Sequence, residues 1–406
     1  MTLWDPDRHE PVAGGAWNEG AARAAIARIV TDTEDAFTPQ GLWPIHASDL
    51  SPERPPDCLK PLYNGAAGVI WALNHLAQTD AVSLSGDYRD AALDLDRRQR
   101  DDLARHPGVA AYMGAERAAY LIGEAGTRLL QWKLTGDRAL LAGLEAFIAE
   151  RIGDPRGVVW GGAGAMFAAL HLHAATAEPR WADLFRRHAD ALWASWDWVE
   201  SAGCHLWTQD LYGLVEPRLS ALHGFAANAH ALLRGGHLLA PARRAEAAQR
   251  IRAAFIATAV REEGLANWPL SATGDTEQPW RVQHCVGAPG MIGALAGLPH
   301  DAAVDSLLLD AGELTWRAGP VVKLPGLCHG APGAGYAFLK LHARTGDERW
   351  LDRARSFAMH AVRQSERALA ADGWRKYSLW TGDLGLAVFL WDCVRAAPQF
   401  PTLDVF

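Results

Sequence analysis

The sequence lacks any run of about 18 apolar residues, which is the length that a membrane-spanning helix needs. The stretch 1–11 also lacks the apolar centre of a signal peptide. Cysteine is scarce, with 5 widely spread residues in 406. Such usage is typical of a reducing compartment, where a special cysteine is a ligand or a nucleophile rather than half of a disulfide. We therefore expect a cytoplasmic protein without a transmembrane segment.

The sequence also has fewer basic than acidic residues. Lys and Arg number 39 against 47 Asp and Glu, which gives a formal net charge of −8 at pH 7. Binding to phosphate backbones needs a basic face, so this balance argues against nucleic acid as a partner. The remaining composition, 49% hydrophobic and 21% charged, is ordinary for a globular protein.

Strand patterns are nearly absent, and a short glycine turn recurs instead. Its pattern is an aromatic or otherwise special residue, a variable residue, glycine, two small residues, and then glycine or a substitute. Each copy runs into a stretch that is apolar on nearly every side, and such a helix is buried. The glycines suit a tight helix entry. The seven copies begin at Tyr63, Tyr112, Val159, Leu222, Cys285, Cys328 and Trp380.

Amphipathic, charged segments alternate with these apolar stretches. The alternation predicts an all-α fold, an α/α toroid in which seven inner helices are surrounded by seven outer helices. An open solenoid of helix pairs would leave one side of the apolar helices exposed, so we favour the closed double ring. We expect a single domain over residues 1–406, with loops 38–62 and 262–283 over one mouth. The outer segments are roughly 16–37, 88–104, 135–153, 178–196, 240–260, 301–317 and 346–364.

In a closed ring the turns share one rim, and we expect the first two residues of each turn to face the axis. Cys285 and Cys328 hold the same place in their turns, and His329 adjoins the second cysteine. Buried cysteines are often inert, but matched positions favour a shared ligand set. Zinc prefers such sulfur and nitrogen ligands, and three protein ligands with one open position are typical of catalytic zinc. The sequence therefore predicts one zinc per chain.

Two further residues are candidates for chemistry at this rim. His223 has the same offset in its turn as His329, and a histidine near a metal is a natural general acid or base. Arg281 lies four residues before Cys285, where a guanidinium would stabilise developing negative charge. The alternatives are a rim histidine satisfied by hydrogen bonds and an arginine in a surface salt bridge.

Taken together, these motifs resemble those of the lanthionine synthetase C-like (LanC-like) family, from about residue 63 to residue 391. Order and spacing carry the resemblance, since any one motif alone would be weak. The strongest stretches are 327–330, 335–339 and 347–351, and the supporting ones are 222–224, 285–290 and 377–382.

The resemblance implies an α/α toroid with zinc held by Cys285, Cys328 and His329. A thiol, from a peptide cysteine or from glutathione, would bind at the open zinc position and add to dehydroalanine or dehydrobutyrine to form a thioether. The resemblance assigns proton transfer to His223 and stabilisation of the enolate to Arg281.

The same resemblance suggests partners and substrate contacts. The implied substrate is a dehydrated peptide or protein, with glutathione and a partner dehydratase as further candidates. Lys323 matches a lysine linked to glutathione contact in stand-alone relatives, and Arg375 is a further anion-binding candidate.

Two positions depart from the family pattern. Gly157 stands where the lantibiotic cyclases carry an aspartate, and Val286 stands where a Tyr or His usually follows the first zinc cysteine. Asp154 and Asp210 are candidates to replace the missing acid. Both departures favour a stand-alone member of the family over a dedicated lantibiotic cyclase.

Two other functions stay open at this point. One is a non-catalytic protein that binds zinc and glutathione. The other is a metal-free, sugar-processing α/α barrel such as an epimerase. Glycoside hydrolysis would need paired carboxylates, for which Glu116 and Asp383 are the acids among the turn residues.

Overall fold

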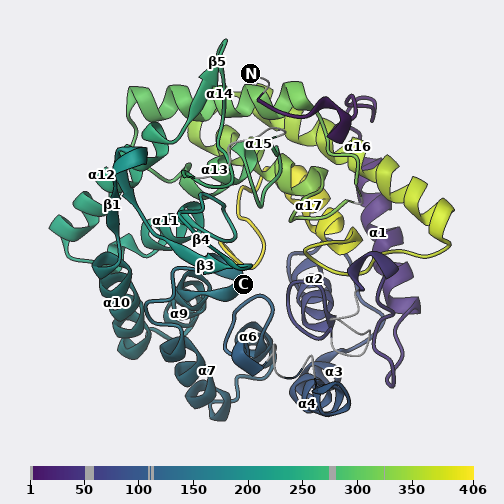
Figure 1. Ribbon diagram of the computed structural model, residues 1–406. Coiled ribbons are helices and arrows are strands. Elements are labelled where there is room, and N and C mark those ends of the chain that lie inside the picture. The colour runs from purple at the N-terminus through teal and green to yellow at the C-terminus, as the bar shows by residue number, and fades with distance from the viewer. Residues whose placement is uncertain (1–2, 51–58, 108–109, 111–113, 274–279, 324) are drawn as a thin grey trace.

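Two concentric rings of helices surround a central axis in the computed structural model, which describes residues 3–50, 59–107, 110, 114–273, 280–323 and 325–406 (Figure 1). The predicted α/α toroid is therefore confirmed. Within the described residues, the inner ring consists of α2 (Ala66–Gln78), α6 (Glu124–Thr135), α9 (Gly162–Thr176), α11 (Phe225–Arg234), α13 (Ala288–Leu295), α15 (Ala331–Thr345) and α17 (Asp383–Arg395). The outer ring consists of α1 (Glu19–Asp35), α3 (Arg89–Leu93) with α4 (Leu95–Arg105), α7 (Ala139–Glu150), α10 (Pro179–Ala194), α12 (Pro241–Ala257), α14 (Ala302–Ala318) and α16 (Glu348–Asp372).

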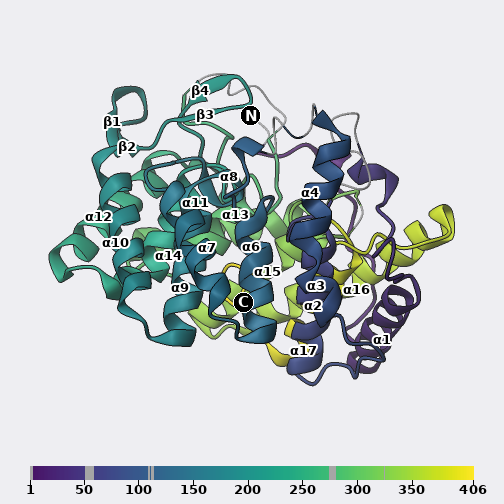
Figure 2. The same cartoon turned by 90° about the horizontal axis from the view of Figure 1, so that it is seen from below.

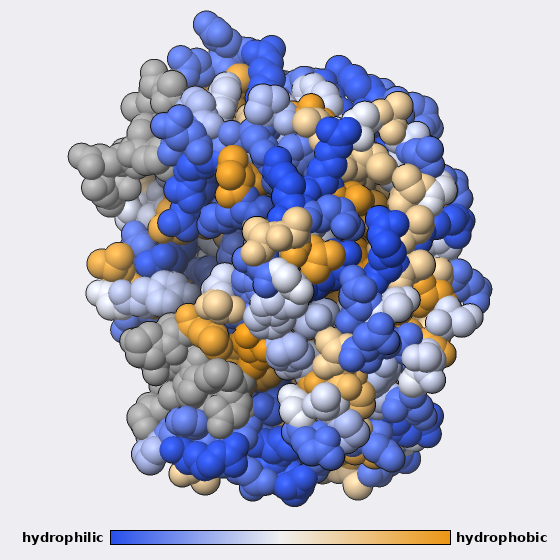
Figure 3. All heavy atoms as spheres, turned by 90° about the vertical axis from the view of Figure 1, so that its right-hand side faces the viewer, coloured by the Kyte–Doolittle hydropathy of each residue, from blue (hydrophilic) through white to orange (hydrophobic). Residues whose placement is uncertain are grey.

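The outer helices follow the predicted amphipathic segments closely, and their ends obey ordinary capping rules. Asn18 caps α1 by accepting a hydrogen bond from the Ala21 N–H, and Asp301 caps α14 in the same way. Figure 3 shows the flank on the side of α1 and α16 as mainly hydrophilic, with hydrophobic residues scattered among polar ones. In the part of the chain that the structure describes, no helix combines the length and the apolar character needed to cross a membrane.

The inner helices begin at glycine turns because no side chain fits there. A Cβ at Gly333 would lie 1.9 Å from the Leu327 carbonyl oxygen, and one at Gly290 would lie 2.0 Å from the His284 carbonyl oxygen. In both cases the clash is with the carbonyl six residues earlier. The second glycine of the pattern therefore allows the turn to fold back against the first turn of its own helix.

A belt of backbone hydrogen bonds links neighbouring turns around the rim. The Cys285 N–H donates to the Cys328 carbonyl (3.1 Å), and the Cys328 N–H donates to the Trp380 carbonyl (2.9 Å). The Trp380 N–H then donates to the Tyr63 carbonyl (3.1 Å). This last bond joins the seventh turn to the first, so it closes the ring.

The second turn differs from the prediction. Tyr112 lies outside the described residues, and α6 begins only at Glu124. Gly123 caps α6 and Gly126 lies in its first turn. A Cβ at Gly126 would lie 2.4 Å from the Tyr120 carbonyl oxygen, as in the other copies. The prediction that the second inner helix follows Tyr112 is therefore wrong. The paired glycines, rather than an aromatic first residue, mark the start of the inner helix.

Short hairpins and single turns complete the chain. Figure 2 shows β1 to β4 and α8 near the same end of the ring, which we call the mouth. The antiparallel pairs are β1 (Asp197–Val199) with β2 (Cys204–Leu206), β3 (Gln209–Leu211) with β4 (Leu214–Glu216), and β5 (Val260–Glu262) with β6 (Leu265–Asn267). The short helices are η1 (Pro6–Arg8), η2 (Ala47–Asp49), α8 (Gly157–Trp160), η4 (Glu200–Ala202) and η5 (Gly236–Leu238).

The C-terminal segment 397–406 fills the centre of the ring, where the end of the chain lies in Figure 1. Phe400 stacks on His284 with ring centroids 4.0 Å apart. Thr402 accepts a hydrogen bond from the Tyr120 hydroxyl through its carbonyl (2.6 Å). Asp404, nearly inaccessible to solvent, forms an ion pair with Lys340 and a hydrogen bond of 2.9 Å with the His230 Nε2. The sequence did not predict this central segment.

Candidate metal centre

A pocket of about 610 Å³ opens at the mouth of the ring. Its lining includes four residues of the glycine turns that were predicted to carry chemistry: His223, Cys285, Cys328 and His329. Described parts of both predicted mouth loops contribute as well, through Leu59 and Pro61 and through Leu270 and Arg281. Trp380, also expected at the rim, is fully buried and packs against Phe400.

The two cysteines and His329 converge as a possible ligand set. One candidate ligand atom from each of Cys285, Cys328 and His329 lies within 4.8 Å of the others. The Cys285 Sγ and the His329 Nδ1 are 3.7 Å apart. The belt of backbone bonds accounts for this convergence, because it fixes the first residues of consecutive turns side by side. Two buried thiols and one imidazole match the donor chemistry that zinc prefers.

The protonation of the cysteine pair is also suited to a metal. Hydrogen bonds from Cys328 and His329 hold the pKa of Cys285 well below its usual range, against the effect of burial. Burial and the neighbouring Cys285 raise the pKa of Cys328. The pair therefore favours one thiolate and one thiol, and binding of a cation would promote loss of the second proton.

A buried glutamine, missed in the sequence, donates to one ligand sulfur. The Gln283 Nε2 lies 2.9 Å from the Cys285 Sγ, and Gln283 also lines the pocket. Its backbone exchanges two hydrogen bonds of 3.1 Å with Val286, which fixes the turn around Cys285. The Tyr63 hydroxyl is hydrogen-bonded to the sulfur of Cys328. The sequence did offer one sign of this role, since Gln283 is a polar residue two positions before the candidate ligand Cys285.

His223 lies at the wall of the pocket in a polar setting. Its backbone N–H donates to the Ser220 Oγ (3.0 Å), which in turn donates to the Cys285 carbonyl (2.6 Å). Its Nδ1 has no hydrogen-bond partner among the described residues. Burial lowers the pKa of His223 to about 4, so the imidazole is neutral at pH 7.

The pocket is cationic. Arg8, Arg281 and Lys323 line it, and none of the described carboxylates forms an ion pair with them. The fourth cation of the lining, Arg218, is buried and paired with Glu216 at 2.7 Å. No Asp or Glu occurs among the described lining residues. The pocket therefore favours anionic ligands.

Arg375 is not brought to the pocket. Its guanidinium is buried, with 1% of the side chain exposed, and it pairs with Asp32 (2.6 Å) and Glu366 (3.2 Å). Asp383, one of the turn acids, is buried on its other side at 3.8 Å. Arg375 therefore anchors α1 and α16 to the turn before α17, and we drop it from the candidate site.

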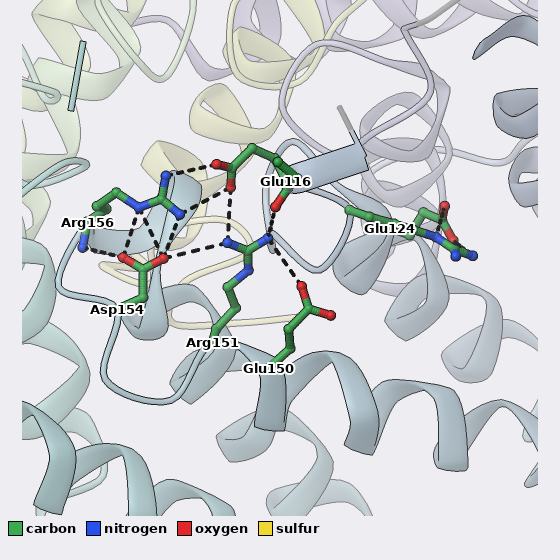
Figure 4. A network of polar contacts seen from close by, with 8 residues as sticks. Glu116, Glu124, Glu150, Arg151, Asp154 and Arg156 are labelled. Carbon is green, nitrogen blue, oxygen red and sulfur yellow. Dashed lines mark hydrogen bonds and ion pairs between the residues drawn. The ribbon is translucent and has the colours of Figure 1, made fainter. Parts of the chain in front are cut away.

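The acids considered as substitutes at Gly157 also point elsewhere. Figure 4 shows Asp154 and Glu116 in a network with Arg151 and Arg156. The Arg156 guanidinium lies 2.7 Å from Asp154 and 2.8 Å from Glu116. Neither acid lines the pocket, and nor does Asp210 on β3. The network joins the chain before α6 to the end of α7.

Gly157 itself has a structural role. Its φ is +78°, and a Cβ there would lie 2.4 Å from the Leu222 carbonyl oxygen and 2.9 Å from the His223 Cα. The backbone of the third turn therefore rests directly against the backbone at His223. An aspartate at this position would need a different local conformation.

Comparisons with known proteins identify relatives of part of the chain. The chain is 35% identical over 128 residues to "Glutathione S-transferase LANCL1" of Danio rerio and 31% identical over 147 residues to "LanC-like protein GCL1" of Arabidopsis thaliana. These matches cover 30% and 34% of this chain but only 31% and 33% of the relatives.

A solved structure extends the likeness over nearly the whole chain. Nisin cyclase superposes with a TM-score of 0.60 over 94% of this chain and 98% of its own, at 16% identity. At this identity the likeness shows the shared fold alone. The model of the family described as "Lanthionine synthetase C-like protein" matches residues 60–405. The chain therefore belongs to the lanthionine synthetase C-like family.

Proposed function

We propose that this protein is a zinc-dependent enzyme that adds a thiol to dehydroalanine or dehydrobutyrine and so forms a thioether. The observation that carries the proposal is the convergence of Cys285, Cys328 and His329 beside His223 in one pocket. The name of one relative, a glutathione S-transferase of the same family, also supports it. Zinc, when bound, would lower the pKa of a thiol that joins it at the open position.

His223 is suited to move the proton of this reaction. In the addition, the sulfur forms a bond to the β-carbon and the π electrons move onto the α-carbon and its carbonyl. The thiol proton must end on the α-carbon. Because His223 is neutral at pH 7, with a pKa of about 4, it accepts that proton first and then delivers it to the α-carbon.

The cations of the pocket supply binding and stabilisation. Arg281 lines the pocket, and its guanidinium would stabilise the enolate oxygen as negative charge develops. Lys323 and Arg8 come from adjoining segments, since the Val322 N–H donates to the Arg8 carbonyl (2.9 Å). Together they would bind the carboxylates of an anionic thiol such as glutathione. A dehydrated peptide or protein is then the electrophile, and a dehydratase would have to supply it.

The test is mass spectrometry of a dehydroalanine peptide incubated with glutathione and the zinc-loaded protein. We expect an adduct heavier than the peptide by the mass of one whole glutathione, because addition to the alkene releases no leaving group. A Cys328→Ala variant is the matched control, because it removes one ligand. An adduct rate equal to that of the variant would refute the proposal.

A second candidate is a protein that binds zinc and glutathione without turnover. Gly157 favours it, because the acid of the cyclases is absent and cannot be accommodated without a local change. Glutathione binding measured by calorimetry, with no adduct in the assay above, would support this reading. The third function was sugar processing. Glycoside hydrolysis is disfavoured, because it needs a pair of carboxylates and the described lining of the pocket holds none.

Zinc itself needs a direct measurement. We expect about one zinc per purified chain, as three protein ligands imply, and a loss of metal in Cys285→Ala. Metal analysis of both proteins decides this point before any assay of activity. Equal zinc content in the two proteins would rule out Cys285 as a ligand.

A further inference from the structure

The tip of hairpin β3–β4 has an unusual residue. Leu211 pairs with Leu214, so the loop contains only Tyr212 and Gly213. Both have left-handed backbones, with φ of 59° and 77°. Such two-residue turns favour Asn, Asp or Gly at the first position, because other side chains are strained there. Tyrosine at this place is therefore a departure that local folding does not explain.

The strained tyrosine lies over the reactive part of the pocket. Its ring packs edge-on to Trp160, at 6.3 Å, and to His223, at 5.9 Å. The Trp160 Nε1 donates to the Tyr212 hydroxyl at 3.3 Å. Even so, 62% of Tyr212 is exposed. Strained residues that persist in a structure are concentrated at functional sites.

Two leucines extend this apolar surface along the pocket wall. Leu214 and Leu270 line the pocket, and they are 56% and 38% exposed. The Leu219 N–H donates to the Leu270 carbonyl (2.8 Å), which holds the two segments together. We call Tyr212, Leu214 and Leu270 the apolar lip. Large exposed apolar side chains gathered beside a pocket are typical of binding surfaces.

Charge separates the lip from the rest of the pocket. The Arg218 guanidinium lies 5.6 Å from the Tyr212 ring, and Glu216 neutralises it. The lining cations without a described carboxylate partner, Arg8, Arg281 and Lys323, lie outside hairpin β3–β4. A cavity of about 610 Å³ is in the range that holds one small ligand. A longer substrate must therefore continue over the rim.

We propose that the apolar lip binds the polypeptide electrophile, by packing Tyr212, Leu214 and Leu270 against an apolar side chain next to the dehydrated residue. This inference rests on the proposed function and names the class of its second substrate. The anionic thiol occupies the cationic part of the pocket, and the alkene lies under Tyr212 beside His223. The lip thereby selects dehydrated residues flanked by aliphatic or aromatic side chains.

The test compares two peptides that differ only in the residues flanking one dehydroalanine, leucine in one and glycine in the other. The measured quantity is the ratio of kcat/KM for the two peptides, which a general loss of activity does not change. We expect the wild type to prefer the leucine-flanked peptide by about tenfold, as one apolar contact allows. Leu214→Ser should reduce this preference strongly.

The chain offers a matched control on the same strand. Val215 is 71% exposed but does not line the pocket, because neighbouring side chains on a strand point to opposite faces. Val215→Ser should therefore keep the preference. Tyr212→Asn should reduce it and also raise Tm, because asparagine tolerates the left-handed backbone. A merely structural tyrosine would not combine these two changes.

A binding measurement separates failure of the lip from failure of the chemistry. Peptides with alanine in place of dehydroalanine cannot react, and their Kd can be measured by fluorescence anisotropy. Tighter binding of the leucine-flanked peptide to the wild type, weakened in Leu214→Ser, would support the lip even without turnover. Equal Kd values for the two peptides would overturn the proposal, whether or not thiol addition occurs.

Discussion

At the cysteine pair, single hydrogen bonds determine how much charge each sulfur carries. Val286 offers no polar group where the family usually has one, and Gln283 supplies a donor to Cys285 from the other side of the turn. An N–H donor to a metal-bound thiolate withdraws electron density from it and orients it. Gln283 is therefore a positioning residue in our interpretation.

Replacement of Gln283 by methionine keeps the volume and removes the donor. We expect zinc affinity to fall about 10–100-fold, the usual effect of losing an outer partner of a ligand. In the cobalt-substituted protein, the sulfur-to-cobalt charge-transfer band should move to lower energy, because the thiolate becomes more electron-rich. Chelator competition and absorption spectroscopy measure the two effects. An unchanged spectrum would show that the amide does not contact the bound ligand.

The low pKa of His223 leads to a second prediction. His223→Asn should slow thiol addition by about 10²–10⁴-fold, the usual contribution of a general acid or base, while zinc content stays unchanged. Burial keeps the folded pKa at about 4, so the proton-accepting form persists as the pH falls from 8 to 6. The rate should therefore show no loss attributable to His223 in that window. A decline with an apparent pKa near that of free histidine would contradict this assignment.

At the scale of elements, the glycine turns explain both the fold and the departure at Gly157. The short helix α8 begins at Gly157, and the Val158 N–H donates to the Leu222 carbonyl (2.9 Å). This bond places the third turn against the fourth, the one that carries His223. The position that bears an acid in the cyclases therefore serves packing here.

Gly157→Asp tests that interpretation directly. We expect it to destabilise the protein by about 1–3 kcal/mol or more, since the left-handed backbone is strained and a close contact is added. Gly136→Asp is the control, because Gly136 has a similar φ of +67° but open space around its Cβ. Thermal unfolding of both variants isolates the contact with Leu222. Equal losses in the two variants would contradict the clash at Gly157.

At the scale of the whole molecule, the C-terminal segment holds the inner ring together from within. Asp404 reaches His230 on α11 and Lys340 on α15, and the Thr402 carbonyl accepts a bond from Tyr120 before α6. Burial opposes ionisation of Asp404, but Lys340 and His230 hold its pKa well below the usual range. The segment thus stabilises the ring from its centre, because it contacts several repeats at once.

Asp404→Asn should reduce the free energy of unfolding by about 3–5 kcal/mol at neutral pH, since it leaves a buried cation without its partner. Because folding lowers the pKa of Asp404, its contribution is complete above the ordinary value of 3.8 and is lost as the pH falls below it. The difference between wild type and variant should therefore shrink in acid. Denaturant unfolding at several pH values measures it.

The exposed Asp210 provides the control for this experiment. Asp210 lies on the surface of hairpin β3–β4, and Asp210→Asn should change stability by less than about 0.5 kcal/mol. A decrease in the free energy of unfolding of Asp404→Asn no larger than this would show that Asp404 does not stabilise the inner ring as proposed.

The repeats in the sequence were enough to predict the double ring and the grouping of Cys285, Cys328 and His329. Glycine turns before fully apolar helices, alternating with amphipathic segments, have few other ways to bury their surface. Cys285 and Cys328 occupy equivalent positions in two copies of the glycine turn, so the repeat predicted that they would lie close together. The second turn was predicted at the wrong place because the pattern began with an aromatic residue, whereas the steric need at Gly126 is only for the absence of a Cβ.

The choice of side chains that reach the pocket depends on the folded structure. Arg375 is neutralised by Asp32, far along the chain. Asp154 is neutralised by Arg156 of its own loop, which also pairs with Glu116 on the segment before α6. Gln283 contacts Cys285 only two positions away, but the hydrophobic period does not predict where its amide points. The apolar lip and the central C-terminal segment depend on contacts between distant segments, and local propensity and hydrophobic period carry no information on such contacts.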